Sequence, residues 1–455
     1  MIKEQQASGK IAAYWTCWEV GMSDSTQTSF ACLEVPAEVG TAAEYGFERC
    51  EGGVCAAEGV SAAGVHAGFR DDPQRLDLAL VVADELCPVA ATFTQNRFCA
   101  APVQVSKARA SRGVSRAIVL NSGNANASTG KPGLEIARDS AAIVAHRLGC
   151  SEEDVLVGST GVIGVLPKLD PFANGIPLAA EALEHSVDAA NAAARAVMTT
   201  DTKSKESSWQ ARLNGGEGKE ILVHVGGFVK GSGMISPNMA TMLAVLSTDA
   251  PLTSSAAQTA LSWAVGHSFN KVTVDSDTST NDTCIMFATG KAGGPVIDEA
   301  SEVFPAIAAA VRAVCEDLAR QIAADGEGAT KLVTVYVINA ATEEEAEVAA
   351  RSIANSPLVK TAIFGHDANW GRIAAAAGKC GIEFDQYEVD IDFLGVPVLR
   401  AGLPVPMDED DMLKRFEEND EVTIVVSLGK GEASSRIWTC DLSHEYVTIN
   451  GDYRT

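Results

Sequence analysis

The sequence lacks the features that would assign it to the membrane, disulfide-rich or nucleic-acid-binding proteins. No apolar run reaches the roughly 18 residues that a membrane-spanning helix needs. Against 60 Asp and Glu residues stand only 35 Lys and Arg residues, which gives a net charge of −25 and leaves no basic stripe for phosphates. None of the 11 cysteines forms a C-x-x-C pair, and an odd number cannot pair completely within one chain. The thiols therefore indicate a reducing compartment, where cysteine acts as a small core residue.

Targeting and metal-binding signals are also missing. The first residues, MIKEQQASGKIAAYW, have neither an apolar stretch of signal-peptide length nor a cleavage site, so we predict a cytoplasmic protein. There is no G-x-x-x-x-G-K-[ST] phosphate loop and no H-E-x-x-H zinc helix. The stretch DSDTSTND at 275–282 begins like a calcium loop, but Thr280 stands where such a loop requires glycine. We therefore predict no metal and no cofactor.

The chain nevertheless has the composition of a globular α/β protein. Its 455 residues, 46% of them hydrophobic, suffice for two or more domains. Residues 1–50 show no sustained periodicity, so we predict a poorly ordered N-terminal extension there. Beyond it, strand-like and helix-like patterns mix throughout, which indicates layered α/β or α+β packing. Strands are predicted at 76–84, 116–124, 219–229, 331–340, 421–429 and 435–443, and helices at 134–149, 175–198, 254–267, 302–324 and 342–355.

Three glycine-bearing polar clusters interrupt these elements. NSGNANASTG (121–130) and GSTGVIG (158–164) each follow a predicted strand, and DGEGATK (325–331) follows a predicted helix. Turn chemistry alone accounts for such residues at the ends of elements. In GSTGVIG, however, consecutive backbone N–H groups of a Thr-Gly turn could also hold an anion or an oxyanion.

The stretch KGSGMISPNMATMLAV (230–245) places a turn-rich approach directly before Thr241. A mid-chain threonine is rarely catalytic, because it needs a base to remove its proton. One solution uses the α-amino group of the same threonine, whose ordinary pKa is about 8. Thr241 gains that amine only if the Ala240–Thr241 bond is cut. A small Ala240 and a Gly- and Pro-containing approach would allow the Thr241 hydroxyl to attack the preceding carbonyl, so the motif is interpreted as a self-cleavage site.

These residues resemble the ornithine acetyltransferase family, bifunctional arginine-biosynthesis proteins that cut themselves at an Ala-Thr bond. The resemblance extends from about residue 52 to the end, with its motifs in order. Besides the segments already quoted, it rests on AAGVHAGFR (62–70), TFTQNRFCAAPV (92–103), MTTDT (198–202), VDSDTSTNDT (274–283), DANWGRI (367–373) and YVTINGDYRT (446–455).

The resemblance implies a role for each matching residue. Thr241 would be the nucleophile, first in self-cleavage and then as the carrier of an acetyl ester. Thr160 and Gly161 would form the oxyanion hole. The substrate-binding set would be Thr199, Lys230, Thr241, Glu327, Asn450 and Thr455. A carboxylate of the substrate suits Lys230 and the hydroxyls, and an ammonium or the reacting amine suits Glu327.

The implied fold is a layered αββα sandwich of the self-processing acetyltransferase and aminopeptidase kind. Cleavage would divide the chain into an alpha fragment, 51–240 with the extension before it, and a beta fragment, 241–455, which includes a smaller α/β region at about 285–400. The two fragments would stay associated, with two copies of each in a heterotetramer.

The implied reaction moves an acetyl group from N2-acetylornithine to glutamate through acetyl-Thr241. Some family members also use acetyl-CoA as a co-substrate, and no signature in this sequence separates the two kinds. Two alternatives stay open: a self-processing aminopeptidase or amidohydrolase with water as acceptor, and a non-enzymatic amino-acid-binding protein on the same scaffold. The intact Thr-Gly, Ala-Thr and C-terminal motifs favour the acetyltransferase.

Overall fold

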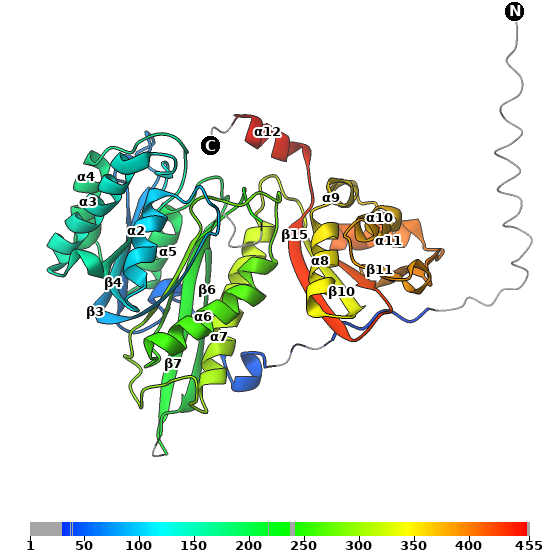
Figure 1. Cartoon of the computed structure of the whole chain (residues 1–455), viewed down its shortest axis with the longest axis horizontal. Coiled ribbons are helices and arrows are strands. Elements are labelled where there is room, and N and C mark those ends of the chain that lie inside the picture. Colours follow the sequence, from blue (N-terminus) through cyan, green and yellow to red (C-terminus); the bar gives the residue numbers. More distant parts are fainter. Residues whose placement is uncertain (1–29, 37, 39, 217, 237–241, 453–455) are drawn as a thin grey trace, which may run out of the picture. The chain divides into compact units, whose positions relative to one another are not determined.

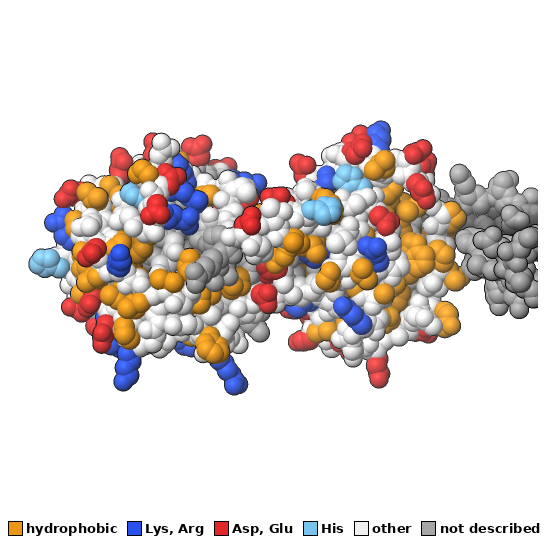
Figure 2. All heavy atoms as spheres, turned by 90° about the horizontal axis from the view of Figure 1, so that it is seen from above, with side chains coloured by type: hydrophobic (Ala, Val, Ile, Leu, Met, Phe, Trp, Pro, Cys, Tyr) orange, Lys and Arg blue, Asp and Glu red, His pale blue; other side chains and the backbone are white. Residues whose placement is uncertain are grey.

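The computed structural model describes residues 30–36, 38, 40–216, 218–236 and 242–452 (Figure 1). The chain divides into two units, Met1–Cys32 and Leu33–Thr455, and the fold described below is that of the second. Asp and Glu side chains are scattered over the face seen in Figure 2, interspersed with Lys and Arg. No helix in the described ranges is long and apolar enough to cross a membrane.

The larger sheet has nine strands in the order β1-β6-β7-β8-β9-β3-β4-β5, with β2 paired to β3. Strand β3 connects its two halves, because residues 78–83 pair with β2 and residues 89–93 pair with β9, with an irregularity between. One continuous strand therefore passes from one layer to the next. The strands are β1 (Glu48–Arg49), β2 (Val60–Val65), β3 (Leu78–Phe93), β4 (Val114–Asn121), β5 (Val155–Ser159), β6 (Lys205–Asn214), β7 (Glu220–Lys230), β8 (Leu243–Thr248) and β9 (Thr283–Ala288).

Alternate side chains of these strands enter different cores, as the two-residue period of a strand requires. Ala244 and Leu246 of β8 pack with α6 (Ser254–His267) and α7 (Phe304–Ala324). Val245, between them, belongs instead to the core on the inner face of the other layer, which also contains Val81 and Ile118. The outer face of that layer is covered by α2 (Ala101–Ala110), α3 (Gly130–Leu148) and α4 (Asp170–Glu181), while α5 (Val187–Ala196) packs on β2. The order helix, sheet, sheet, helix confirms the predicted αββα sandwich.

A second sheet of six strands has the order β13-β12-β11-β14-β10-β15. One face packs on helices around Phe416 and Phe393, whereas Trp438 and Cys440 on β15 belong to the core beneath α7. These shared residues attach the second sheet to the sandwich. Its elements are β10 (Leu332–Ala340), α8 (Glu343–Ala354), α9 (Pro357–Phe364), α10 (Trp370–Gly378), β11 (Asp390–Phe393), β12 (Val396–Arg400), β13 (Leu403–Pro404), α11 (Glu409–Glu418), β14 (Glu421–Ser427) and β15 (Ala433–Cys440).

The remaining elements are short. Helix α12 (His444–Asp452) follows the second sheet near the C-terminal end of the chain (Figure 1). The 3-10 helices are η1 (Ala43–Tyr45), η2 (Gly53–Cys55), η3 (Glu152–Asp154), η4 (Phe269–Lys271) and η5 (Gln386–Glu388).

Three expectations differ from the structure. The helix predicted over 175–198 is two helices, because Ser186 caps the N-terminus of α5 and residue Glu184 bridges to Ala62 of β2. Residues 42–50, assigned to a poorly ordered extension, contain η1 and β1, and β1 pairs with β6. The strands of the second sheet extend over 332–440, whereas the smaller α/β region was expected at about 285–400.

Candidate functional site

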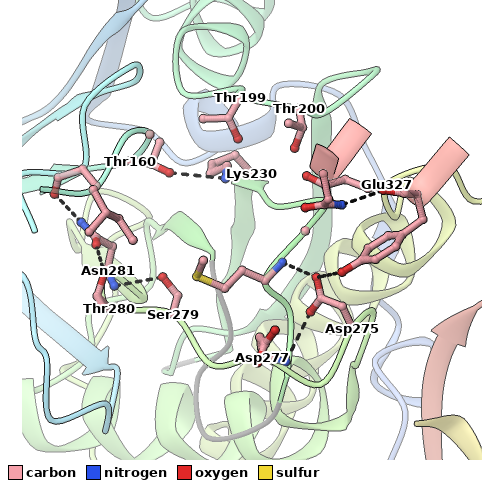
Figure 3. A pocket seen from close by; sticks show the side chains of 17 residues that line it. Thr160, Thr199, Thr200, Lys230, Asp275, Asp277, Ser279, Thr280, Asn281 and Glu327 are labelled. Carbon is pink, nitrogen blue, oxygen red and sulfur yellow. Dashed lines mark hydrogen bonds between the residues drawn. The ribbon is translucent and has the colours of Figure 1, made fainter. Parts of the chain in front are cut away.

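One cavity of about 200 Å³ gathers most of the sequence motifs (Figure 3). It lies where the ends of β5 and β7 meet the loops after β7, before β9 and after α7, with α12 on its rim. We call this cavity the pocket. Its lining consists of Ala125, Thr160, Gly161, Ile163, Thr199, Thr200, Lys230, Gly233, Met234, Asp275, Asp277, Ser279, Thr280, Asn281, Glu327, Tyr446 and Asn450.

The turn at Thr160–Gly161 is built against the 121–130 loop. The Thr160 N–H donates to the Asn121 carbonyl over 3.0 Å, and Val162 donates to Gly123 over 3.3 Å. Gly161 has φ +129°, and a Cβ added to it would lie 2.4 Å from the carbonyl carbon of Gly123. Only glycine fits there. In the described part of the chain the Gly161 N–H donates to no acceptor, so this donor is available to a ligand.

Asn281 joins the same two motifs from a third segment. Its Nδ2 donates to the Ala125 carbonyl at 2.6 Å and to the Ser159 carbonyl at 2.8 Å. Asn281 is 4% exposed, and its two bonds tie Ser159, directly before the turn, to Ala125 in the neighbouring 121–130 loop. The role of Asn281 was not predicted from the sequence. The only signal was the polarity of 274–283, a stretch that by its spacing resembles an incomplete calcium loop.

Lys230 ends strand β7 with its side chain buried, at 2% exposure for the residue. Its Nζ donates to the Thr160 hydroxyl oxygen at 3.4 Å (Figure 3). Burial lowers the pKa of Lys230, and the carboxylate of Asp201 opposes that effect. Because Lys230 supplies the proton of this hydrogen bond, the Thr160 hydroxyl keeps its own proton for another acceptor.

Carboxylates line another part of the pocket. Asn450 on α12 donates to Glu327 Oε2 at 2.7 Å, and the Glu327 N–H donates to the Ser232 carbonyl at 3.1 Å. A Cβ on Gly233 would lie 2.3 Å from the Glu327 carboxyl, so glycine at 233 leaves room for that side chain. Glu327 is thus held from both sides and directed into the pocket.

Asp275 supports the approach to the predicted cleavage site. Its two oxygens accept from the Met234 N–H at 2.6 Å and the Ile235 N–H at 2.8 Å. The Tyr446 hydroxyl lies 3.4 Å from Asp275 Oδ2. Burial raises the pKa of Asp275, and the backbone donors oppose it. Neither Asp275 nor Tyr446 was assigned from sequence, because ordinary anchoring residues carry no local pattern.

The structure brings most of the predicted site residues together. The six that it describes all line the pocket: Thr160, Gly161, Thr199, Lys230, Glu327 and Asn450. Ala240, Thr241 and Thr455 lie outside the described residues. Among the described residues, the Met242 N–H donates to Asp282 Oδ1 at 3.0 Å, and Leu243 of β8 pairs with Lys230 of β7.

The arrangement suits a small molecule that carries both a carboxylate and an amine. An ammonium group and uncommitted N–H and O–H donors lie around Lys230 and Thr160, and Glu327 supplies an acceptor. Among the residues that the structure describes, no group of three or more His, Cys, Asp or Glu side chains could hold a metal ion.

Known proteins resemble this chain over most of its length. The sequence pattern of the ArgJ family matches residues 61–455. The arginine biosynthesis bifunctional protein ArgJ of Chlorobaculum tepidum is 46% identical over 400 residues, which is 88% of this chain and 96% of that protein. The chloroplastic ArgJ of Oryza sativa subsp. indica is 43% identical over 415 residues, 90% of this chain and 89% of that one. A solved ArgJ chain from Bacillus halodurans is 42% identical and covers 45% of this chain and 96% of its own, with a TM-score of 0.44. With its family pattern matched over almost the whole length after residue 60 and relatives above 40% identity, the chain belongs to the ArgJ family.

Proposed function

We propose that this protein is a self-cleaving glutamate N-acetyltransferase of arginine biosynthesis, which moves the acetyl group of N2-acetylornithine to glutamate. The acetyl group is carried between the two amino acids as an ester on Thr241. Two relatives, from Chlorobaculum tepidum and Oryza sativa, are named as bifunctional proteins of arginine biosynthesis. Covalent catalysis of this kind divides one difficult amide exchange into two easier steps.

The observation that carries the proposal is that separate sequence segments supply one pocket. Thr160, Lys230 and Glu327 come from the end of β5, the end of β7 and the loop after α7, and the resemblance of the sequence to the acetyltransferase family implies a site role for each of them. A substrate carboxylate is attracted by the Lys230 ammonium. The substrate amine finds an acceptor in Glu327, which Asn450 holds at 2.7 Å.

The first half-reaction begins at the Thr241 hydroxyl. After cleavage of the Ala240–Thr241 bond, the free α-amine of Thr241 accepts the hydroxyl proton as Oγ attacks the acetyl carbonyl carbon. The tetrahedral oxyanion accepts hydrogen bonds from the Thr160 hydroxyl and the Gly161 N–H. The C–N bond then breaks, and the leaving α-amine of ornithine takes the proton from the Thr241 amine. In the second half-reaction the amine of glutamate attacks the ester, and the same steps run in reverse.

Self-processing is tested by intact mass spectrometry of the purified protein. The wild type is expected as two fragments, 1–240 and 241–455, and Thr241→Ala as one uncut chain. Ser236→Ala is a matched control, because it removes a hydroxyl from the same approach without touching the proposed nucleophile. A wild-type protein found only as the uncut 47.4 kDa chain contradicts the proposal.

The acceptor is tested by incubation with N2-acetylornithine, with and without glutamate. Acetyl transfer requires ornithine release to depend on glutamate and to match the N-acetylglutamate formed. Ornithine release that does not depend on glutamate indicates the alternative, a hydrolase of the aminopeptidase kind with water as acceptor. Replacing N2-acetylornithine by acetyl-CoA in the same assay tests whether acetyl-CoA is a co-substrate.

The proposal extends to assembly and location. The two fragments remain associated, two of each form a heterotetramer, and the enzyme works in the cytoplasm without a cofactor. Native mass spectrometry is expected to give a mass of two full chains, each composed of one alpha and one beta fragment. Fragments that separate during size-exclusion chromatography contradict the proposed assembly.

A further inference from the structure

Behind the pocket lies a buried ion network that the proposed mechanism does not use. The side chain of Lys205, on β6, is 0% exposed. Its Nζ donates to Asp201 Oδ1 at 2.6 Å and to Asp325 Oδ2 at 2.5 Å. We call Lys205, Asp201 and Asp325 the Lys205 network. None of its members lines the pocket.

Asp201 connects this network to two parts of the pocket. Its Oδ2 accepts from the Thr199 N–H at 2.9 Å, and its Oδ1 accepts from the Gly231 N–H at 2.8 Å. Thr199 lines the pocket directly, and Gly231 follows Lys230 in the chain. Nearby cations hold the pKa of Asp201 below its ordinary value despite burial. A charged Asp201 therefore fixes the backbone of Thr199, in the lining of the pocket, and that of Gly231, next to Lys230 in the chain.

Asp325 connects the network to the carboxylate of the pocket. It accepts from the Thr202 N–H at 3.1 Å and from the Thr202 hydroxyl. Its own carbonyl accepts from the Ser232 hydroxyl at 2.6 Å, and Glu327 lies two residues further along the chain. The Ser232 carbonyl in turn accepts from the Glu327 N–H at 3.1 Å. The segments 199–202, 230–232 and 325–327 are thus joined by bonds that converge on Lys205.

We propose that Lys205 is a positioning residue for acetyl transfer, which sets the separation between Lys230 and Glu327 through Asp201 and Asp325. This inference rests on the proposed function and deepens it. Acting from outside the pocket, Lys205 keeps the cation of the site and its carboxylate at the spacing that the substrate requires. Small displacements of such groups are costly, because binding and catalysis depend on their alignment.

The charges explain why a lysine occupies this position. An isolated carboxylate is costly to bury, and two that share one ammonium are each compensated and hydrogen-bonded. Lys205 also acts on Lys230 at a distance, because its positive charge lowers the pKa of Lys230. The charged groups that influence Lys230 are Asp201, Lys205, Glu327 and Asp282.

The test uses a charge-balanced double variant, Lys205→Met with Asp325→Asn. It removes one cation and one anion, so the net charge of the Lys205 network is unchanged. Asp201 loses Lys205 but keeps the N–H donors of Thr199 and Gly231 and the nearby charge of Lys230. The amide oxygen introduced at position 325 can still accept from Thr202. The expected result is a cooperatively folded protein in which the KM for N2-acetylornithine rises at least tenfold. The alkaline limb of the pH profile of kcat/KM also moves to higher pH, because Lys230 loses a neighbouring positive charge.

Lys271→Met with Glu347→Gln is the matched control. It removes another buried lysine and its carboxylate, which lie 2.5 Å apart, at a place that does not line the pocket. A purely structural role for Lys205 predicts that both double variants keep the wild-type KM and the wild-type pH profile. A wild-type KM in the Lys205 double variant overturns the inference, and so does a wild-type pH profile.

Two further measurements distinguish a loss of folding from a loss of positioning, and a failure of the proposed function from a failure of the role of Lys205. If circular dichroism shows that the double variant is unfolded, Asp325→Asn alone must raise the KM, since it removes the charge that aligns Lys205 but keeps an acceptor oxygen. A wild-type KM for Asp325→Asn then overturns the proposal. If the wild type itself transfers no acetyl group, the proposed function fails, whereas an active wild type with an unaltered Lys205 variant refutes only the positioning role.

Discussion

Replacing Gly161 by alanine tests the most constrained point of the proposed site. The φ of +129° lies in a region that only glycine populates freely, and forcing another residue into it costs about 1–3 kcal/mol. The new Cβ would also lie 2.4 Å from Gly123 C and 2.6 Å from Asn124 N, both backbone atoms that cannot rotate away. Moving them breaks the hydrogen bonds from Val162 to Gly123 and from Ala125 to Val162, each of about 1 kcal/mol. We therefore expect Gly161→Ala to lower the free energy of unfolding by about 4 kcal/mol.

Gly164→Ala is the matched control for this prediction. Gly164 lies three residues further along the same loop with φ +81°, but no atom would lie within 4 Å of its added Cβ. It should cost only the left-handed backbone conformation, about 1 kcal/mol. Both free energies are measured by urea denaturation, and acetyl transfer is measured where both variants are folded. Displacing one oxyanion donor should lower kcat roughly 100- to 1000-fold in Gly161→Ala alone. Equal stabilities and equal rates for the two variants would refute the close approach and the role of the turn.

Two further predictions concern carboxyl groups. Burial holds the pKa of Asp282 well above its ordinary value, while the Met242 N–H and Lys230 oppose it. The folded state therefore binds more protons than the unfolded state above pH about 4, and the free energy of unfolding falls as pH rises from there towards the folded pKa. Asp282→Asn should remove this part of the decline, whereas the control Asp71→Asn, at an exposed position, should keep it. Urea denaturation from pH 5 to pH 8 measures how the free energy of unfolding depends on pH. The same dependence in the wild type and both variants contradicts the prediction. Gly233→Ala should displace the Glu327 carboxyl, which would lie 2.3 Å from the new Cβ, and raise the KM about tenfold, as expected for weakening one charged hydrogen bond. Its unfolding free energy should fall by about 1 kcal/mol, because the Glu327 side chain can move aside but gives up the bond from Asn450. An unchanged KM in steady-state assays contradicts the prediction.

Local periodicity predicted many of the elements correctly. Helix α3 was expected over 134–149 and ends before Gly149, whose left-handed φ of +64° forms its C-cap. Strands β10 and β14 were found from their apolar runs, because they are interior strands of the second sheet and contribute alternate Val and Ile residues to its core. The strand expected at 76–84 is longer in the structure and continues to Phe93 as β3. Its second half was not predicted, because the polar residues around Glu85, at the irregularity where β3 passes between layers, interrupt the apolar run.

Elements without a distinctive local pattern were missed. Every residue of β8 is buried, since helices cover one face and the other sheet layer covers the opposite face. Such a strand shows no alternation of polar and apolar residues, and its six residues cannot be told from a piece of buried helix. Helix α5 could not be separated from α4 by composition, because both are rich in alanine and the break depends on a contact with β2.

By itself the sequence determined the chemistry that the site can perform. The Thr-Gly turn and the Ala-Thr bond are visible as short motifs, because each needs particular residue types at adjacent positions, whereas Lys230 and Glu327 were expected at the site from the resemblance to the ornithine acetyltransferase family. Only the tertiary structure decided how these groups are held. Lys205 and Asp325 are 120 positions apart, and Asn281 reaches Ala125 across 156 positions. Contacts over such distances leave no periodic trace in the chain, since they depend on how the two sheet layers and the second sheet pack together.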